Sequence, residues 1–125
     1  MQKELIICST LLIETSPQAL PLGAACIASA LKNDLLTKDK FEVKLISQSL
    51  EDIANKKIDD VALYFANILL EQNPKYLCFS VYVWNRNLIE QTAKVIKQKS
   101  ANIVIIAGGP EVTANPLSFE NFDYT

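Results

Sequence analysis

Residues 80–85 (SVYVWN) bring together side chains that could contact a ligand. The segment contains Ser80, Tyr82, Trp84 and Asn85. A hydroxyl and an amide can hydrogen-bond a polar ligand, and aromatic rings can cover a flat apolar surface. The same residues are equally typical of rings that pack on a neighbouring helix, with Asn85 serving only as the cap of that helix. Both interpretations remain open from this segment alone.

A second candidate segment follows the apolar run at residues 103–107. It reads Gly108, Gly109, Pro110, Glu111, Val112 and Thr113. Glycine accepts positive φ angles, so the pair can simply form a turn. Missing side chains would also let a large ligand approach the backbone, and Glu111 and Thr113 could either contact its polar edges or be solvated. A turn is the better interpretation when the two glycines are considered alone.

The sequence contains no histidine. This absence excludes a Ser–His or Cys–His couple and removes the commonest metal ligand. The three cysteines, Cys8, Cys26 and Cys78, lie in apolar runs without a CxxC spacing. Because an odd number of scattered cysteines does not suit a secreted disulfide framework, we expect small buried thiols and a cytoplasmic protein without a signal peptide.

Length and charge limit the classes of protein. The chain has 125 residues, which suits one domain spanning 1–125, and 12 basic against 14 acidic residues give a net charge of −2. Nucleic acid is an unsuitable partner because no basic patch stands out. The most apolar helix candidate, residues 20–31, is too short and too rich in Gly and Ala to span a membrane.

The apolar pattern predicts alternating strands and helices. Strands are expected at residues 4–9, 41–47, 76–83 and 102–107, with a fifth beginning at 122–125. Helices are expected at residues 21–34, within 50–74, at 85–100 and, as a short turn, at 116–122. The first, which we call the small-residue helix, contains Gly23 and four alanines, so it can lie close to the element on which it packs. This order predicts an α/β fold with a doubly wound, mostly parallel sheet, flavodoxin-like or Rossmann-like, in three α/β/α layers. Because the sequence stops inside a predicted strand, we expect it to be a fragment of a larger enzyme.

Ligands of such sheets bind beyond the carboxyl ends of the strands, near the point where the strand order reverses. Three loops leave those ends, at residues 9–20, 80–87 and 108–116. The first contains neither GxGxxG nor GxxxxGK[ST], which disfavours nucleotide phosphates, and it matches the phosphate loop of a flavodoxin poorly. The first and third predicted strands also end without the acidic residues that a receiver domain needs.

Three segments in order, PLGAACIASAL, FSVYVWN and IIAGGPEVTANP, resemble the N-terminal cobalamin-binding domain of cobalamin-dependent radical S-adenosylmethionine enzymes. The resemblance covers nearly the whole chain. In the wider cobalamin-binding fold, DxHxxG supplies a histidine to cobalt, and SxL and GG accommodate the nucleotide tail. Here residues 80–82 correspond to SxL and Gly108 and Gly109 to GG, whereas DxHxxG is missing. The resemblance therefore implies cobalamin bound base-off without a histidine ligand.

The resemblance also implies a set of cofactor-binding residues: Pro21, Leu22, Ser80, Tyr82, Trp84, Asn85, Gly108, Gly109, Pro110, Glu111, Val112 and Thr113. The tail would run beside the two glycines and the small-residue helix, and Tyr82 and Trp84 would face the lower side of the corrin. S-adenosylmethionine and a [4Fe-4S] cluster are expected only in a radical domain C-terminal to residue 125. This chain alone would then hold no catalytic residue and no protein-bound metal, and the whole enzyme would carry out methyl transfer or another radical reaction.

Two alternatives remain besides a cobalamin carrier. One is a cofactor-free doubly wound domain with a structural or interaction role in the same kind of protein. The other is an unrelated small-molecule sensor with a flavodoxin-like fold.

Overall fold

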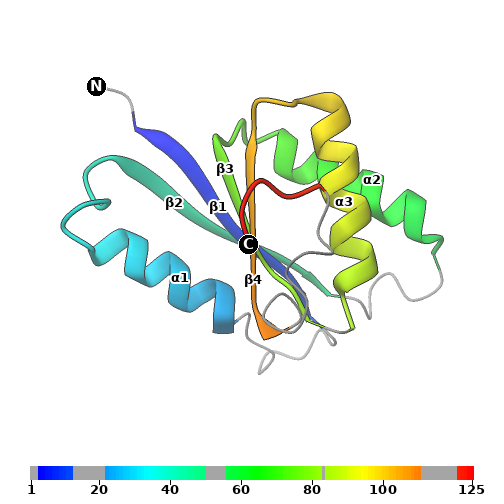
Figure 1. Ribbon diagram of the computed structural model, residues 1–125, viewed down its shortest axis with the longest axis horizontal. Helices are drawn as coiled ribbons and strands as arrows, with labels where there is room; N and C mark the ends of the chain where they lie inside the picture. Colours follow the sequence, from blue (N-terminus) through cyan, green and yellow to red (C-terminus); the bar gives the residue numbers. More distant parts are fainter. Residues whose placement is uncertain (1–2, 13–21, 50–55, 83, 111–120) are drawn as a thin grey trace.

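Four parallel strands form a single sheet in this computed structural model, which describes residues 3–12, 22–49, 56–82, 84–110 and 121–125 (Figure 1). The strand order is β2-β1-β3-β4. The strands are β1 (Glu4–Leu12), β2 (Phe41–Ser49), β3 (Tyr76–Ser80) and β4 (Val104–Gly108). The chain leaves β1 for β2 on one side and returns to β3 on the other, so the strand order reverses between β1 and β3.

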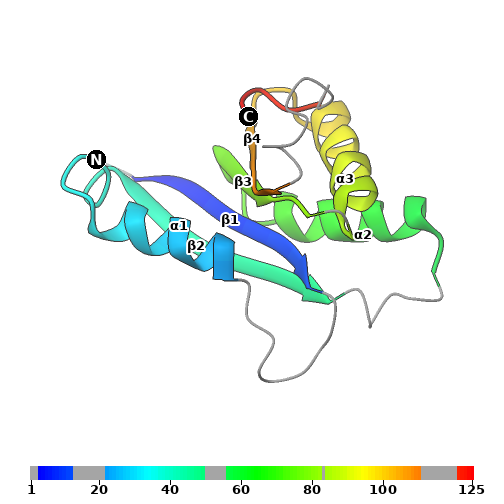
Figure 2. The same ribbon diagram turned by 60° about the horizontal axis from the view of Figure 1, so that its bottom comes forward.

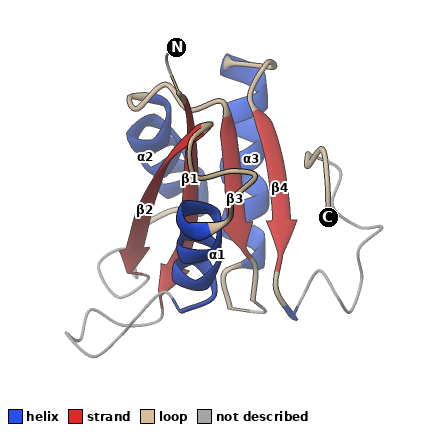
Figure 3. Ribbon diagram, turned by 90° about the vertical axis from the view of Figure 1, so that its left-hand side faces the viewer, coloured by secondary structure: helices blue, strands red, loops and turns tan. Residues whose placement is uncertain are grey.

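The described helices cover both faces of the sheet. These are α1 (Leu22–Asn33), α2 (Ile58–Leu70) and α3 (Arg86–Lys99). Figure 3 shows α1 in front of the strands and α2 and α3 behind them. The predicted three-layer α/β/α arrangement with a parallel sheet is thus confirmed.

The larger apolar core lies between the sheet and the helices α2 and α3. Phe65 and Leu69 of α2 meet Phe79 of β3 and Ile89 of α3 there, and all four side chains are buried. The rings of Phe65 and Phe79 meet edge to face, with centroids 6.5 Å apart. Burial of large side chains on this face supplies most of the hydrophobic free energy of folding.

The face covered by α1 has a smaller core. Ala24 and Ala28 of α1 pack with Ile6 and Cys8 of β1 and with Val43 of β2. Small side chains let this helix lie close to the sheet, as its composition predicted. The helix packs on β1, β2 and β3 (Figure 2), whereas the β4 residues on the same face, Val104, Ile106 and Gly108, are only half-buried.

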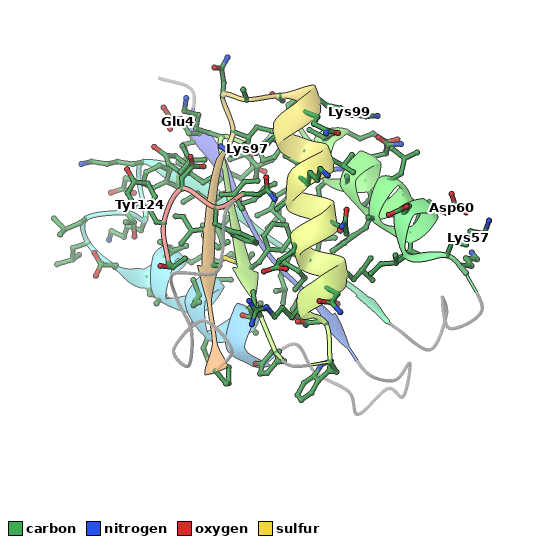
Figure 4. All side chains as sticks on the ribbon, turned by 45° about the vertical axis from the view of Figure 1, so that its right-hand side comes forward. Glu4, Lys57, Asp60, Lys97, Lys99 and Tyr124 are labelled. Carbon is green, nitrogen blue, oxygen red and sulfur yellow. The ribbon has the colours of Figure 1, made fainter. Side chains whose placement is uncertain are left out.

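The C-terminal segment 121–125 returns to the free edge of β4. Tyr124 forms a parallel bridge with Ile106, the start of the predicted fifth strand. The Asp123 carboxylate accepts hydrogen bonds from Ile105 N at 2.7 Å and from Lys97 Nζ at 2.6 Å. Lys97 reaches from α3 to this segment (Figure 4), so the segment is held by side chains as well as by backbone.

Several boundaries differ from the predicted ones. β1 and β2 run three and two residues further than expected, because they pair with each other as far as Leu12 and Ser49. β3 ends at Ser80, since the next residues form a turn in which Asn85 N donates to Tyr82 O. The helix expected at 116–122 lies almost wholly outside the described residues, as does the start of the 50–74 segment. In the described parts of the chain, no helix has the length and apolarity needed to cross a membrane.

Candidate functional site

The carboxyl ends of β1 and β3 bring two hydroxyl-bearing residues together at the reversal of strand order. The Thr10 hydroxyl donates a hydrogen bond of 2.8 Å to the Ser80 carbonyl oxygen. Both residues are buried. Ser80 also pairs with Gly108 in the sheet register, so three strand ends meet at this edge. This is the position where parallel α/β sheets bind their ligands.

Asn85 lies immediately before α3 and faces back into the loop. Its side-chain oxygen accepts a hydrogen bond from Tyr82 N at 2.8 Å, and its side-chain nitrogen donates to the Thr10 hydroxyl at 3.2 Å. The residue occupies the N-cap position of α3, but its side chain makes no capping hydrogen bond. The interpretation of Asn85 as only a helix cap is therefore wrong: its side chain ties the third-strand loop to β1.

Tyr82 and Trp84 form a stacked pair, which we call the aromatic platform. Their rings are parallel within 3°, with centroids 4.7 Å apart. Trp84 is 47% exposed, whereas Tyr82 is half-buried. The platform thus presents a flat apolar surface with one polar hydroxyl, the kind of surface that covers a planar ligand.

The first turn of α1 lies against this loop, next to Ser80 and Tyr82. A Cβ atom built on Gly23 would be 2.9 Å from the Tyr82 hydroxyl oxygen and 3.2 Å from Ser80 Oγ. Only glycine allows so close an approach without movement of these side chains. Gly23 was noted in the sequence as part of a small-residue helix, and the structure shows which neighbours require its small size.

The two glycines that end β4 differ in their surroundings. A Cβ atom on Gly108 would meet no atom of the described residues within 4 Å, whereas one on Gly109 would lie 2.7 Å from the Val81 carbonyl oxygen. Gly109 also has a φ angle of 107°, which L side chains rarely adopt. Gly109 therefore has the turn role that local chemistry predicted, and Gly108 borders open space on the face that carries α1.

The predicted site residues fall into two groups in the structure. Ser80, Tyr82, Trp84, Asn85, Gly108, Gly109 and Pro110 are described, and they gather at the carboxyl edge of β3 and β4. Pro21, Glu111, Val112 and Thr113 lie outside the described residues, as does the side chain of Leu22, the residue that opens α1. Thr10 was not singled out from the sequence. A hydroxyl at the carboxyl end of a central strand was the only available signal.

The ionisable groups beneath the site are thiols. Cys8 and Cys78 are partners in the β1–β3 register. A hydrogen bond with Cys78, together with burial, raises the pKa of the Cys8 thiol far above its ordinary value. The same bond lowers the pKa of Cys78, and burial opposes that shift. Because Cys8 is buried and its pKa is raised, it is unsuited to act as a thiolate nucleophile.

One further polar group lies on β1 beside Thr10. The Ser9 hydroxyl is buried without a hydrogen-bond partner among the described residues. The described parts of the chain also contain no group of three or more His, Cys, Asp or Glu residues that could hold a metal ion. The described residues at this edge are suited to binding by stacking and hydrogen bonds.

Comparison with known proteins gives two likenesses. No family model matches the sequence. A stretch of 46 residues is 39% identical to a cobalamin-dependent radical SAM methyltransferase, TokK, of Streptomyces tokunonensis, and it covers 37% of this chain and 7% of that protein.

The second likeness is to a solved structure, that of a novel cobalamin-binding protein from Desulfitobacterium hafniense DCB-2. The TM-score is 0.56 at 17% sequence identity, over 97% of this chain and 51% of that protein. The chain therefore spans about half the length of this structural neighbour and a small part of the curated relative. Both names agree with the resemblance inferred from the sequence, and the chain shares the fold of that cobalamin-binding protein.

Proposed function

We propose that this chain binds cobalamin at the carboxyl edge of β1, β3 and β4. The observation that carries the proposal is the space that the described residues leave open beside Gly108, at the same sheet edge as the exposed aromatic platform. These features lie at the reversal of strand order, where ligands of this fold bind. The two likenesses to cobalamin proteins support the choice of ligand.

The described residues fit the size and chemistry of a corrinoid. The aromatic platform offers a broad apolar surface to one face of a large ring, and Trp84 is exposed enough to make that contact. Gly108 leaves room for a bulky nucleotide tail along the face that α1 only partly covers. The sequence contains no histidine, so no imidazole of this chain would coordinate the cobalt. The proposal, in line with the resemblance, is therefore a base-off cofactor without a histidine ligand.

The wider context is a radical S-adenosylmethionine enzyme with this chain as its cofactor-carrying part. Bound cobalamin would supply a methyl group for transfer to a substrate radical. The S-adenosylmethionine and the [4Fe-4S] cluster would belong to a radical domain C-terminal to residue 125 in a longer cytoplasmic protein. Within that enzyme, the residues of this chain would bind and orient the cofactor and shield one face of it from water.

Retention of hydroxocobalamin tests the proposal directly. The folded chain is mixed with an excess of hydroxocobalamin, free cofactor is removed by gel filtration, and the visible spectrum gives the stoichiometry and the base-off or base-on state. We expect retention with a base-off spectrum. If neither this chain nor a longer protein that contains it retains the corrinoid, the proposal is wrong and a cofactor-free structural domain is the better interpretation.

Two variants assign the retention to this site. Trp84→Ala should weaken binding, because it removes the exposed half of the platform. Tyr64→Ala is the matched control, since Tyr64 is an exposed aromatic residue of α2 on the opposite face of the sheet. Equal losses in both variants would show that the corrinoid binds elsewhere.

A further inference from the structure

Every backbone hydrogen-bonding group of Tyr82 is held by one residue. Tyr82 N donates to Asn85 Oδ1 at 2.8 Å, and Tyr82 O accepts from Asn85 N at 3.2 Å. A residue whose N–H and C=O are both fixed cannot rotate its peptide planes freely, so the direction of its Cα–Cβ bond is fixed as well. Asn85 thereby fixes the position from which the Tyr82 ring extends, and Trp84 stacks on that ring.

Asn85 is itself oriented by β1. Its side-chain nitrogen donates to the Thr10 hydroxyl at 3.2 Å and lies 3.5 Å from the Ser80 carbonyl oxygen. The Thr10 hydroxyl in turn donates a hydrogen bond of 2.8 Å to that carbonyl oxygen. The direction of each bond is determined, because a carbonyl oxygen can only accept and an amide nitrogen can only donate. We call this buried chain, from Asn85 through Thr10 to Ser80, the brace.

The brace is shielded from water. Asn85 is 1% exposed and Thr10 is 2% exposed. A buried polar network with every bond made holds a single geometry, and the loss of one bond leaves a buried polar group unsatisfied. Asn85 is therefore too deeply buried to contact a ligand over a large area, although it is bonded to the loop that carries the aromatic platform.

We propose that Asn85 and Thr10 are positioning residues: they act on the cofactor only through Tyr82 and Trp84, by holding the aromatic platform in the orientation that a corrin ring needs. This inference rests on the proposed cobalamin function and refines it. It assigns Asn85 an indirect role in place of direct contact, and it adds Thr10, which lies on a different strand, to the determinants of binding.

Isosteric substitutions separate the brace from general packing. Thr10→Val keeps the side-chain shape but removes the hydroxyl, whereas Thr10→Ser keeps the hydroxyl. Asn85→Asp keeps an acceptor for Tyr82 N but cannot donate to Thr10. Thr92→Val is the matched control, because Thr92 is a fully buried threonine of α3 whose hydroxyl donates to Leu88 O at 2.7 Å within the helix.

Two readouts are measured on each folded variant. The first is the dissociation constant of hydroxocobalamin, from the visible spectrum. The second is the emission of Trp84, which is the only tryptophan of the chain and therefore reports on the platform alone. We expect Thr10→Val and Asn85→Asp to bind about tenfold more weakly, the consequence of one lost buried hydrogen bond, with altered emission and acrylamide quenching. Thr10→Ser and Thr92→Val should keep wild-type values of both.

The outcomes are distinguishable. Thr10→Val and Asn85→Asp could lower the urea midpoint while their dissociation constant and Trp84 emission stay equal to those of the control Thr92→Val. The brace would then be only structural, and the inference would be overturned. If the wild-type chain binds no corrinoid, the proposed function fails. In that case the brace is tested by emission alone, and a Trp84 emission in Thr10→Val equal to that of the wild type would overturn it. Should Asn85→Asp fail to fold, Thr10→Val decides the matter alone.

Discussion

Gly109 lies directly against the backbone of Val81: a Cβ atom on Gly109 would be 2.7 Å from the Val81 carbonyl oxygen. No shift of a flexible side chain can relieve this contact, and the φ angle of 107° adds strain for any other residue. We expect Gly109→Ala to lower the free energy of unfolding by about 1–3 kcal/mol, measured by urea denaturation. Equal stability of Gly109→Ala and wild type would contradict this close approach.

Gly108 should behave in the opposite way. Its Cβ position meets no atom of the described residues within 4 Å and it lies in a strand, so Gly108→Val should change the free energy of unfolding by less than about 1 kcal/mol. The added side chain would occupy the space proposed for the cofactor tail, and retention of hydroxocobalamin should be lost. Gly108→Ala gives an intermediate volume at the same position. Undiminished retention in Gly108→Val would show that this space is not part of the site.

Gly23→Ala should move the aromatic platform without unfolding the chain. The new methyl group would meet the Tyr82 hydroxyl, which lies at the end of a side chain that can yield. Alanine in place of glycine favours a helix by about 1 kcal/mol, which offsets the cost of the contact. We expect a native urea midpoint with a shifted Trp84 emission. In the double variant with Tyr82→Phe the shorter contact is removed and only the 3.2 Å contact with Ser80 Oγ remains. A shift as large as that of Gly23→Ala, measured relative to Tyr82→Phe alone, would rule out this explanation.

The carboxylate of Asp123 should make stability depend on pH. Slight burial raises its pKa, but the hydrogen bonds from Lys97 and Ile105 N outweigh this and lower the pKa below its ordinary value. Its stabilising contribution is then complete above the unfolded pKa of about 3.9 and is lost as the pH falls through the lower folded value. The effect should be small, because the side chain is 38% exposed and screened by solvent.

Asp123→Asn removes this titration. The stability difference between wild type and variant should be constant near neutral pH and should shrink below about pH 4, as measured by urea midpoints across the acid range. Asp39→Asn, an exposed acid in the turn before β2, controls for the change in net charge. A difference that grows on acidification would contradict the assigned role.

The three cysteines should react at very different rates. Cys26 is exposed, Cys8 is buried, and Cys78 is half-buried beside Cys8. Since a thiol must be accessible and ionised to react, we expect one fast thiol in the native chain with Ellman's reagent and three after denaturation. Cys26→Ser should abolish the fast phase. Two fast phases in the native chain would show that the β1–β3 pair opens readily.

The fold could be predicted because each element carries a local signal. Apolar runs at β3 and β4 and helical spacing in α2 identify those elements without tertiary information. The full lengths of β1 and β2 could not be predicted in this way. Their last residues are held by pairing with each other, as in the Leu12–Ser49 pair, and no alternating pattern marks that end.

The site was only partly predictable for a similar reason. Residues 80–85 and 108–113 stand out locally by composition, but nothing local distinguishes Gly108 from Gly109. The difference depends on Val81, the residue that follows β3. Thr10 and Asn85 meet only because β1 and β3 are neighbours in a particular register. The local sequence around a polar residue near a strand end does not indicate which distant residue it will contact.

The bond between Thr10 and Asn85 joins residues 75 positions apart. Contacts at this separation form late, because a long loop must close first, and parallel sheets are slow to assemble for the same reason. A chain that has formed α3 but not yet paired β1 with β3 would therefore carry Trp84 without a fixed Tyr82 beneath it. Under the proposed function, cofactor loading would follow completion of the sheet, and Trp84 emission should reach its native value only in the slowest refolding phase.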